Sequence, residues 1–469
     1  MIPVPTRAGQ RLAIFGLGAS GLAAGRALVA SGAKVSAWDD DGRRREAAGK
    51  IGMPLLDLYR ASWTRIEGLV LAPGIPLTHP APHPVVELAK KAHCPVLGDI
   101  ELFAETAPTA IVIGITGTNG KSTITALVGH VLKSAGKSIQ VGGNLGTPVL
   151  DLDPLPADGA YVLELSSYQL DLTEHAKFDV AVLVNVSPDH LDRHGGMSGY
   201  VAAKRRIFRA RGPDEAKRRK IAQTAVIGMD DSYSREIHDA LSHESAWRVV
   251  PVSGMRRIEG GVYVIDGLLY DETAGAHGPV LDVRSAPNLP GAHNWQNAAA
   301  AYAAARAAGA APSDIARSIE TYPGLPHRQE RIATVKGVTF INDSKATNGD
   351  SAARALACYA AIYWIAGGKP KDDGLGKAVE WLHGVRHAYL IGEAAARFEG
   401  DLAGKVKTNR SETLARAMRE AFADARKEHA EDAVVLLSPA CASFDQFANF
   451  EARGEAFRAE VAKIAKEAQ

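Results

Sequence analysis

The residues from Ile111 to Thr123, IVIGITGTNGKST, combine the residue types that hold a nucleoside triphosphate. An apolar β-branched run is followed by a glycine-rich turn, and Lys121 and Ser122 open a helical pattern. Glycines let backbone N–H groups close around phosphate oxygens, and a helix N-terminus adds the positive end of its dipole. Ile115 stands where the strict phosphate-loop spacing has glycine. We predict a triphosphate cradle in which Lys121 reaches the phosphates and Ser122 ligates Mg²⁺; the alternative is a turn with a solvated lysine.

A second glycine turn, Gly16 to Gly21 (GLGASG), follows a predicted strand near the N-terminus and opens a helical pattern. Asp39 ends the next predicted strand. This spacing fits the dinucleotide fingerprint, so it predicts a nucleotide phosphate at the helix N-terminus with Asp39 near a sugar or base. The alternative is tight packing of strand and helix without a ligand. A separate triphosphate loop argues against a plain dehydrogenase.

Polar side chains also end two predicted strands after the triphosphate loop. Glu164 follows the run AYVL, and the segment from Asn185 to His194 follows VAVLV. Mg²⁺ prefers one or two carboxylates together with phosphate oxygens and water, so Glu164 is predicted to share an ion with the loop. His190 would face the same sheet edge in a metal or substrate role. From spacing alone, Lys204 is predicted to be an exposed helix lysine.

The C-terminal third repeats this arrangement. Its polar clusters are His327–Arg328, 342–348 (NDSKATN), 367–371 (GGKPK) and 438–445 (SPACASFD), and the last three follow predicted strands. Because parallel strands end at one sheet edge, these three clusters should face one crevice. Basic and hydroxyl groups there suit a small dianionic substrate and a transferred phosphate. Helix capping by Ser, Thr and Asp is the alternative for any one cluster.

Length and composition set limits on the kind of protein. A chain of 469 residues exceeds what one core organises, so we predict three domains. Lys and Arg number 54 against 53 Asp and Glu, so nothing indicates a nucleic-acid or anionic-membrane partner. Three well-separated cysteines, Cys94, Cys358 and Cys441, favour a reducing compartment. The first ten residues lack a signal-peptide apolar region, and no apolar run reaches the ~18 residues of a membrane span, so we expect a soluble cytoplasmic protein.

The alternation of apolar runs with helical patterns predicts an α/β fold. Short strands are expected at 68–75, 94–100, 160–167, 180–187, 337–344, 361–368, 387–393 and 433–440. Shorter strands with glycine-rich turns are expected over 225–283, and the alanine-rich stretch 294–310 is expected to be a helix. The predicted domains are 1–103, Rossmann-like; 104–324, a P-loop ATPase-type α/β domain; and 325–469, also Rossmann-like.

Together these motifs resemble the Mur ligase family, the ATP-dependent amide-bond-forming enzymes of peptidoglycan precursor assembly. The resemblance covers nearly the whole length, since GLGASG, GDIELF, ITGTNGKST, GGNLGTP, ELSSYQL, NVSPDHLDRH, AHNWQN, GLPHR, INDSKATN and SPACASFDQF occur in the family's order. INDSKATN and SPACASFDQF resemble members that add glutamate to UDP-N-acetylmuramoyl-L-alanine. The Asp-Asn-Pro-Arg motif expected of the diamino acid ligase is absent from the sequence.

The resemblance implies a role for each matching residue. The ATP contacts would be Gly117, Thr118, Asn119, Gly120, Lys121, Ser122, Thr123, Asn297, Arg328 and Asp343. The UDP-linked substrate would contact Gly18, Ala19, Ser20, Asp39, Asp40, Asn144 and His190. D-Glutamate would contact Thr347, Lys371, Ser443 and Phe450. Two Mg²⁺ ions would be held by Ser122, Glu164, His190 and Lys204, the last as a carbamate. The catalytic residues would be Lys121, Glu164, His190, Lys204 and Lys345. Asp40-Asp41 stands where family members often carry Thr-Arg.

The implied reaction joins two steps in one enzyme. The substrate carboxylate takes the γ-phosphate of ATP to form an acyl phosphate, and the amine of glutamate then displaces phosphate. Because an acyl phosphate hydrolyses readily, these two steps imply closure of the third domain over the second, about hinges near residues 104 and 325, and we expect a monomer. Three alternatives are a sibling ligase such as one extending folate with glutamate, a nicotinamide oxidoreductase and a P-loop switch. The choice between D- and L-glutamate stays open from the residues alone.

Overall fold

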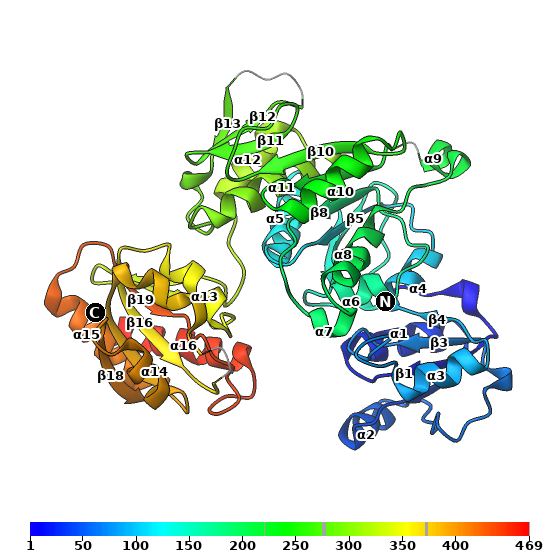
Figure 1. Cartoon of the computed structure of the whole chain (residues 1–469), viewed down its shortest axis with the longest axis horizontal. Helices are drawn as coiled ribbons and strands as arrows, with labels where there is room; N and C mark the ends of the chain where they lie inside the picture. The colour runs from blue at the N-terminus through cyan, green and yellow to red at the C-terminus, as the bar shows by residue number, and fades with distance from the viewer. Residues whose placement is uncertain (220, 274–277, 371–373, 469) are drawn as a thin grey trace. The chain divides into compact units, whose positions relative to one another are not determined.

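The computed structural model describes residues 1–219, 221–273, 278–370 and 374–468. It contains three sheets, of four, nine and six strands, in chain order (Figure 1). The chain divides into two compact units. The first comprises Met1–Val283 and Trp295–Thr321, and the second comprises Arg284–Asn294 and Tyr322–Gln469.

The N-terminal sheet is fully parallel, with strand order β2-β1-β3-β4. Its strands are β1 Arg11–Phe15, β2 Lys34–Trp38, β3 Gly68–Leu71 and β4 Val96–Leu97. Its helices are α1 Ala19–Ala30, α2 Gly42–Lys50, α3 Pro84–Lys91 and α4 Asp99–Glu105. Gly16, between β1 and α1, has a left-handed φ of 95°. A side chain there would also collide with Ala72, so this turn requires glycine.

The central sheet follows the order β13-β12-β11-β10-β9-β8-β5-β7-β6. It is parallel from β11 to β6, and β12 and β13 add an antiparallel edge. The strands are β5 Ile111–Thr116, β6 Ile139–Gly143, β7 Ala160–Glu164, β8 Val180–Leu183, β9 Thr224–Gly228, β10 Arg248–Ser253, β11 Val262–Ile265, β12 Leu268–Asp271 and β13 Pro279–Asp282. The helices are α5 Lys121–Ser134, α6 Ser167–Asp171, α7 Leu191–His194, α8 Met197–Arg205, α9 Pro213–Arg219, α10 Ser232–Ser242, α11 His293–Ala307 and α12 Pro312–Glu320.

The C-terminal sheet has the order β14-β15-β19-β16-β17-β18, and β14 is its antiparallel edge. The strands are β14 Glu330–Val335, β15 Val338–Asn342, β16 Ala361–Gly367, β17 Val385–Ile391, β18 Lys407–Glu412 and β19 Ala433–Leu437. The helices are α13 Gly349–Leu356, α14 Ala395–Leu402, α15 Leu414–Glu428 and α16 Phe450–Glu467, with a 3-10 segment, η6, at Gly376–Gly384. One apolar core on this sheet includes residues of α13, η6 and α14, and the other includes residues of α15 and α16.

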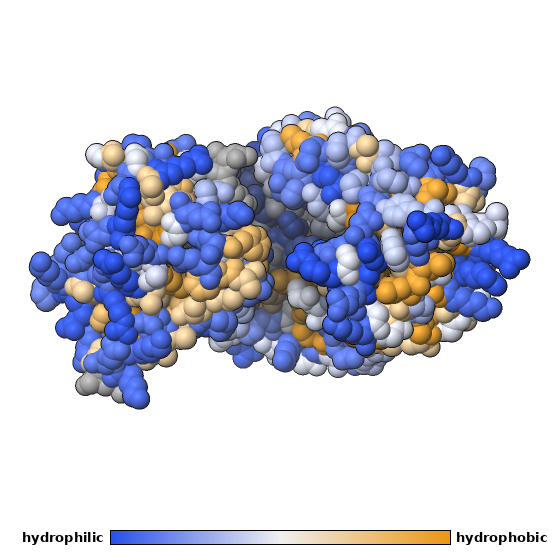
Figure 2. Space-filling view, turned by 90° about the horizontal axis from the view of Figure 1, so that it is seen from below, coloured by the Kyte–Doolittle hydropathy of each residue, from blue (hydrophilic) through white to orange (hydrophobic). Residues whose placement is uncertain are grey.

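The predicted α/β class and the predicted strands are confirmed, and each expected apolar run contains a strand. The domain limits after residues 103 and 324 and the hinges near 104 and 325 stay predictions. Among the described residues, no helix combines the length and apolar character that crossing a membrane requires. On the face shown in Figure 2, hydrophilic residues predominate and apolar residues gather in smaller patches between them.

Candidate active site

The loop between β5 and α5 has the backbone shape of a phosphate cradle. Gly120 precedes α5 with a left-handed φ of 83°, a conformation that glycine adopts without strain. A Cβ atom at this position would overlap the side-chain amide of Asn297, which lies on α11. The structure therefore brings Asn297 against the loop, although more than 170 residues separate the two in the sequence.

Lys121, the first residue of α5, folds back over its own loop. Its Nζ donates hydrogen bonds to the carbonyl oxygens of Gly117, at 2.9 Å, and Thr118, at 2.8 Å. Ser122 is buried in the first turn of the same helix. The loop therefore carries an ammonium group, a hydroxyl and a helix N-terminus in one place, which is the combination that binds phosphate oxygens.

The segment after β8 holds this loop in shape. Thr118 donates its backbone N–H to the Asn185 carbonyl at 2.9 Å, and Asn119 donates its own to the Asn185 side-chain oxygen at 2.9 Å. The Thr118 hydroxyl lies 3.0 Å from both the Ser187 carbonyl and the Tyr200 hydroxyl. The predicted strand-end cluster from Asn185 onward is thus in direct contact with the loop. Tyr200, on α8, was not predicted.

Lys204, also on α8, is buried beside the loop, with 1% of its surface exposed. Its Nζ donates a hydrogen bond to the Gly117 carbonyl at 2.8 Å, the oxygen that also accepts from Lys121. Burial lowers the pKa of Lys204 well below its usual value, the nearby Lys121 lowers it further, and Asp189 and Glu164 act against this. The expectation from spacing alone, an exposed helix lysine, is wrong.

Glu164, at the end of β7, is buried as well. Its Oε1 accepts a hydrogen bond from the Asn144 side chain at 2.6 Å. Its Oε2 is buried and accepts none from the protein. A buried carboxylate oxygen without a partner is costly unless a cation or a donor satisfies it, so this oxygen fits a Mg²⁺ ligand.

His190 opens the short helix α7 with a left-handed φ of 51°. Its Nε2 lies 3.5 Å from Asp189 Oδ2, and its ring centroid lies 5.0 Å from that of Tyr168. Among the described residues, no three His, Cys, Asp or Glu side chains are grouped closely enough to hold a metal ion by themselves. Any metal at this sheet edge would therefore take further oxygen ligands from a phosphate, a hydroxyl or a modified lysine.

The glycine turn of the N-terminal sheet presents the start of α1. Gly18 precedes this helix in an extended conformation and gives it no side-chain cap. The first N–H groups of a helix have no partner within it, so an uncapped N-terminus suits an anionic ligand. Ser20 donates a hydrogen bond to the buried Asp99 of α4. Ala19 and Ser20 thus form the first turn of α1, and their contact with the UDP-linked substrate stays a prediction.

Asp39 mainly fixes the backbone around this turn. It is buried, and it accepts hydrogen bonds from the backbone N–H of Leu17 at 2.6 Å and of Asp41 at 2.8 Å. The neighbouring Asp40 carboxylate has two aromatic partners that the sequence analysis missed. Tyr59 donates its hydroxyl to Asp40 Oδ1 at 2.8 Å, and His83 Nε2 lies 3.2 Å from Oδ2.

In the C-terminal unit, Lys345 and Thr347 follow β15, and Ser443 follows β19. Lys345 Nζ lies 3.8 Å from the centroid of the Phe450 ring, a cation–π contact. Thr347 and Arg328 lie on the adjoining loops, and Ser443 is buried after β19. Lys371 lies outside the described residues.

Arg453, on α16, is a buried residue that the sequence analysis missed. Its guanidinium donates to the Ser344 hydroxyl at 3.0 Å and the Ser344 carbonyl at 2.9 Å. It also donates to the carbonyls of Cys441, at 3.1 Å, and Ala442, at 3.3 Å. One side chain therefore ties the loop after β15 to the loop that carries Ser443. An arginine on a charged C-terminal helix has no local feature that distinguishes it from a surface residue.

Asp343 provides a test of the electrostatics in this unit. It is buried, accepts from the Ser438 hydroxyl at 2.8 Å and the Gln329 N–H at 3.1 Å, and burial raises its pKa to about 7. Between the ordinary value of 3.8 and about 7, the folded protein holds a proton that the unfolded chain releases, so this group's contribution to stability falls as the pH rises.

Calorimetry without ligands gives the melting temperatures of Asp343→Asn and of the unchanged protein at pH 5 and pH 8. We expect the melting temperature of the variant minus that of the unchanged protein to be roughly 5 °C higher at pH 8 than at pH 5. The asparagine cannot ionise, so the cost of a buried charge at pH 8 disappears. The same difference at both pH values would show that Asp343 does not titrate between them.

Ser443 gives a second prediction for the same unit. Its hydroxyl is the small buried donor after β19 that is predicted to contact glutamate. We expect Ser443→Ala to raise the KM for glutamate about tenfold, the cost of one hydrogen bond to a charged group, and to change the KM for ATP far less. Steady-state kinetics with each substrate varied in turn measures both. An equal rise in the two constants would remove Ser443 from the glutamate site.

Two segments of the chain match known protein-family domains. Residues 115–305 match the Mur ligase middle domain, and residues 327–441 match the Mur ligase glutamate ligase domain. The first contains the phosphate loop, Glu164, His190, Lys204 and Asn297. The second contains Asp343, Lys345 and Thr347. The two matched segments include the loops whose geometry is described above.

Curated relatives extend the similarity to nearly the whole chain. The UDP-N-acetylmuramoylalanine--D-glutamate ligase of Phenylobacterium zucineum is 51% identical over 471 residues, covering 99% of this chain and 98% of the relative. The protein of the same name from Rhodospirillum rubrum is 52% identical over 470 residues, covering 99% and 97%.

Solved structures share the fold at lower identity. UDP-N-acetylmuramate-alanine ligase MurC from Thermotoga maritima aligns with a TM-score of 0.58 and 16% identity, covering 97% of this chain and 99% of that one. MurF from Acinetobacter baumannii aligns with a TM-score of 0.56 and 22% identity, covering 78% and 79%. At these identities the likeness concerns the fold alone. The two domain matches and the full-length relatives show that the chain belongs to the Mur ligase family.

Proposed function

We propose that this chain joins D-glutamate to UDP-N-acetylmuramoyl-L-alanine at the expense of ATP, giving ADP and phosphate. The observation that carries this proposal is the convergence of Lys121 and Lys204 on the carbonyl of Gly117, beside the buried carboxylate of Glu164. In such a site Lys121 would neutralise phosphate oxygens, and Glu164 together with a modified Lys204 would hold Mg²⁺ for the second anion. The substrates follow from the relatives of about 50% identity, whose names state this ligation.

The chemistry requires two anions to meet. In the first step the substrate carboxylate oxygen bonds to the γ-phosphorus while the bond to the β,γ-bridging oxygen breaks, so that ADP leaves and an acyl phosphate remains. In the second step the glutamate amine attacks the acyl carbon, phosphate departs and the amine loses its proton. Both steps gain from fixed positive charge at the phosphates.

Lys121 and the first turn of α5 supply part of that charge. In the resting structure the Lys121 ammonium bonds to two loop carbonyls, and we propose that it exchanges these for phosphate oxygens when ATP binds. Asn185 and Tyr200 keep the loop in place while this happens, because their contacts with Thr118 and Asn119 do not involve Lys121. Asn297 and the C-terminal residues Arg328 and Asp343 are proposed to contact the rest of ATP.

The buried groups beside the loop fit a magnesium site. We propose that Ser122, Glu164, His190 and Lys204 hold two Mg²⁺ ions, with Lys204 converted to a carbamate. The unpartnered Oε2 of Glu164 supports the first part. The depressed pKa of Lys204 supports the second, because only a neutral amine adds carbon dioxide and the product is an anion suited to a metal. Bound Mg²⁺ would supply positive charge toward the phosphate oxygens.

The remaining residues are proposed to orient the substrates. Gly18, Ala19, Ser20, Asp39 and Asp40 would bind the UDP group, with Asn144 and His190 near its reacting end. Thr347, Lys371, Ser443 and Phe450 would bind D-glutamate, and Lys345 would support phosphoryl transfer. Because an acyl phosphate hydrolyses readily, closure of the C-terminal unit over the loop, with hinges near 104 and 325, would exclude water. All three cysteines are free thiols, in keeping with a cytoplasmic protein, and we propose a monomer.

Product analysis tests the proposed reaction. Incubation of the chain with ATP, Mg²⁺, UDP-N-acetylmuramoyl-L-alanine and D-glutamate should give a UDP-linked product larger by one glutamyl residue, with one ADP and one phosphate per product. Formation of ADP and phosphate without that product would leave an ATPase and contradict the ligase proposal. Hydride transfer to a nicotinamide, or preference for GTP, would favour the other classes considered above.

A further inference from the structure

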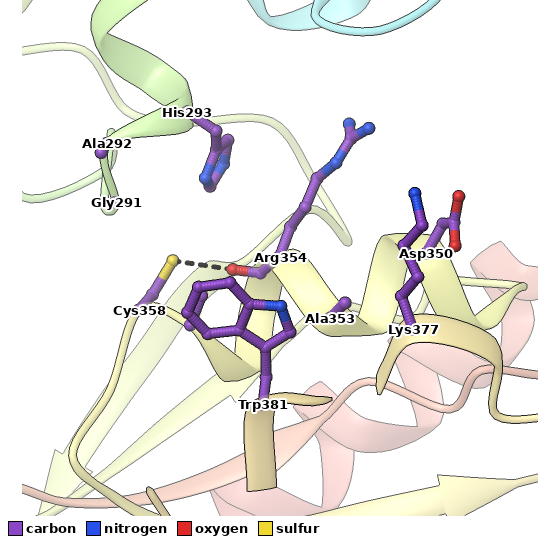
Figure 3. A pocket seen from close by; sticks show the side chains of 10 residues that line it. Gly291, Ala292, His293, Asp350, Ala353, Arg354, Cys358, Lys377 and Trp381 are labelled. Carbon is purple, nitrogen blue, oxygen red and sulfur yellow. Dashed lines mark hydrogen bonds between the residues drawn. The ribbon is translucent and has the colours of Figure 1, made fainter. Parts of the chain in front are cut away.

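A cavity of about 450 Å³ lies within the second compact unit and is lined by none of the residues assigned above (Figure 3). Its walls come from the segment Gly291–His293, from α13 with the turn that follows it, and from η6. The volume falls in the range of small-molecule sites in proteins. None of the residues that line it has a role in the reaction proposed above.

An exposed tryptophan forms one wall. Trp381 is 41% exposed, although it lies on an element whose neighbours pack into the core. Its backbone departs from helical geometry inside η6, at φ −116° and ψ 30°. Ala353 and Ala357 extend the apolar wall beside it. A large flat apolar side chain left open to a cavity offers a surface on which a planar ring can stack.

The charged groups of the cavity leave one positive charge unbalanced. Arg354 and Lys377 are cations, and Asp350 is the carboxylate among the lining residues, so the formal net charge of the lining is +1. In the described chain, the Arg354 guanidinium has no hydrogen bond or ion pair, although burial removes much of its water and lowers its pKa. Figure 3 shows Lys377 and Asp350 together at one end of the cavity, apart from the Arg354 guanidinium.

A neutral imidazole adds a hydrogen-bond donor to the lining of the cavity. Burial lowers the pKa of His293 to about 4, so the ring is uncharged at neutral pH. Asn294 Nδ2 lies 3.2 Å from His293 Nε2, which makes Nε2 the acceptor and leaves the hydrogen on Nδ1. Figure 3 shows His293 and Arg354 extending from different walls of the cavity.

The wall around Cys358 is closely fitted. Its Sγ donates to the Arg354 carbonyl at 3.0 Å, and a Cβ atom at Gly291 would lie 2.6 Å from this sulfur. Burial raises the pKa of the thiol to about 12, so it stays protonated and unreactive. The segment Gly291–His293 therefore packs against α13 without room for a side chain at Gly291. Cys358 serves as a wall of this cavity and not as a nucleophile.

We propose that this cavity binds a small aromatic carboxylate, with the ring on Trp381 and the carboxylate between the Arg354 guanidinium and His293 Nδ1–H. A carboxylate matches both the single excess charge and the two neighbouring donors. The division between the two compact units falls between Asn294 and Trp295, inside α11. His293, which lines the cavity, directly precedes Asn294, the last residue of this unit's first segment.

The test is isothermal titration of the full chain with indole-3-acetate and with indole-3-acetamide, its uncharged analogue. We expect one site for the acetate and binding of the amide at least about tenfold weaker. Arg354→Gln should weaken the acetate by a similar factor and leave the amide nearly unchanged, whereas Trp381→Leu should weaken both. Arg386→Gln is the matched control, because Arg386 is an exposed arginine of the same unit on β17.

Three results would overturn the proposal. They are no measurable binding of the acetate, equal affinities for acetate and amide, or equal affinities of the unchanged protein and Arg354→Gln for the acetate. Displacement of the acetate by D-glutamate, together with full binding to Arg354→Gln, would assign the anion to the predicted glutamate site instead. The comparison of acetate with amide uses the unchanged protein, so it decides the question even if a variant folds poorly.

Discussion

Replacing Lys121 by alanine is expected to lower phosphate release from ATP by about 100- to 1,000-fold, the usual cost of removing one preorganised charged donor from a phosphoryl-transfer site. The side chain holds two loop carbonyls in the resting structure, and no other ammonium group opens α5. Binding of UDP-N-acetylmuramoyl-L-alanine should persist, because Gly18 and Asp39, which are proposed to bind its UDP group, follow β1 and β2 of the N-terminal sheet and not strands of the central sheet. Phosphate release and a binding titration on the same preparation measure the two effects.

The matched control is Lys133→Ala. Lys133 is an exposed lysine in the last turn of the same helix, far along it from the loop. We expect this variant to keep full activity. Loss of substrate binding in Lys121→Ala, with Lys133→Ala intact, would contradict the assignment of ATP and the UDP group to different sheets.

Replacing Lys204 by alanine is expected to lower activity by at least about 100-fold. The reason is specific to the buried amine: as a carbamate it would present oxygen ligands next to Glu164, and as alanine it leaves an apolar gap. Short carboxylic acids such as propionate, which can place a carboxylate in that gap, should restore part of the activity. The control is Arg205→Ala, at the exposed neighbouring position on α8. This variant should keep full activity, and propionate should not alter that activity.

The carbamate itself can be detected without measuring turnover. Protein equilibrated with ¹³C-bicarbonate should show a carbamate carbon signal that is absent from Lys204→Ala and present in Arg205→Ala. Full activity of the alanine variant, or the same carbamate signal with and without Lys204, would show that Lys204 does not act as a carbamate.

Much of the fold could be predicted from the sequence because apolar β-branched runs mark the buried parallel strands directly. Glu164 and Asn185 each follow such a run, so their positions at the carboxyl ends of strands of the central sheet were predictable. The phosphate loop was predictable for a similar reason, since its two glycines and Lys121 fall within the five residues 117–121. In each case the information lies within a few residues.

Burial that arises from distant packing could not be predicted in the same way. Lys204 lies in the charged stretch AAKRR, and only the contact of α8 with the phosphate loop explains its desolvation. The partners of Asp40, Tyr59 and His83, come from separate loops. Arg453 is buried because two loops present their carbonyl oxygens to it, and nothing in its own helix indicates this.

Phosphate release with ATP, Mg²⁺ and UDP-N-acetylmuramoyl-L-alanine, compared between D-glutamate, L-glutamate and no amino acid, tests the proposed ligation. We expect rapid release with D-glutamate and little release in the other two reactions. Release with L-glutamate alone would keep the acyl-phosphate chemistry and overturn the substrate. No release with either enantiomer would contradict the proposed ligation and direct attention to the sibling ligases of the family.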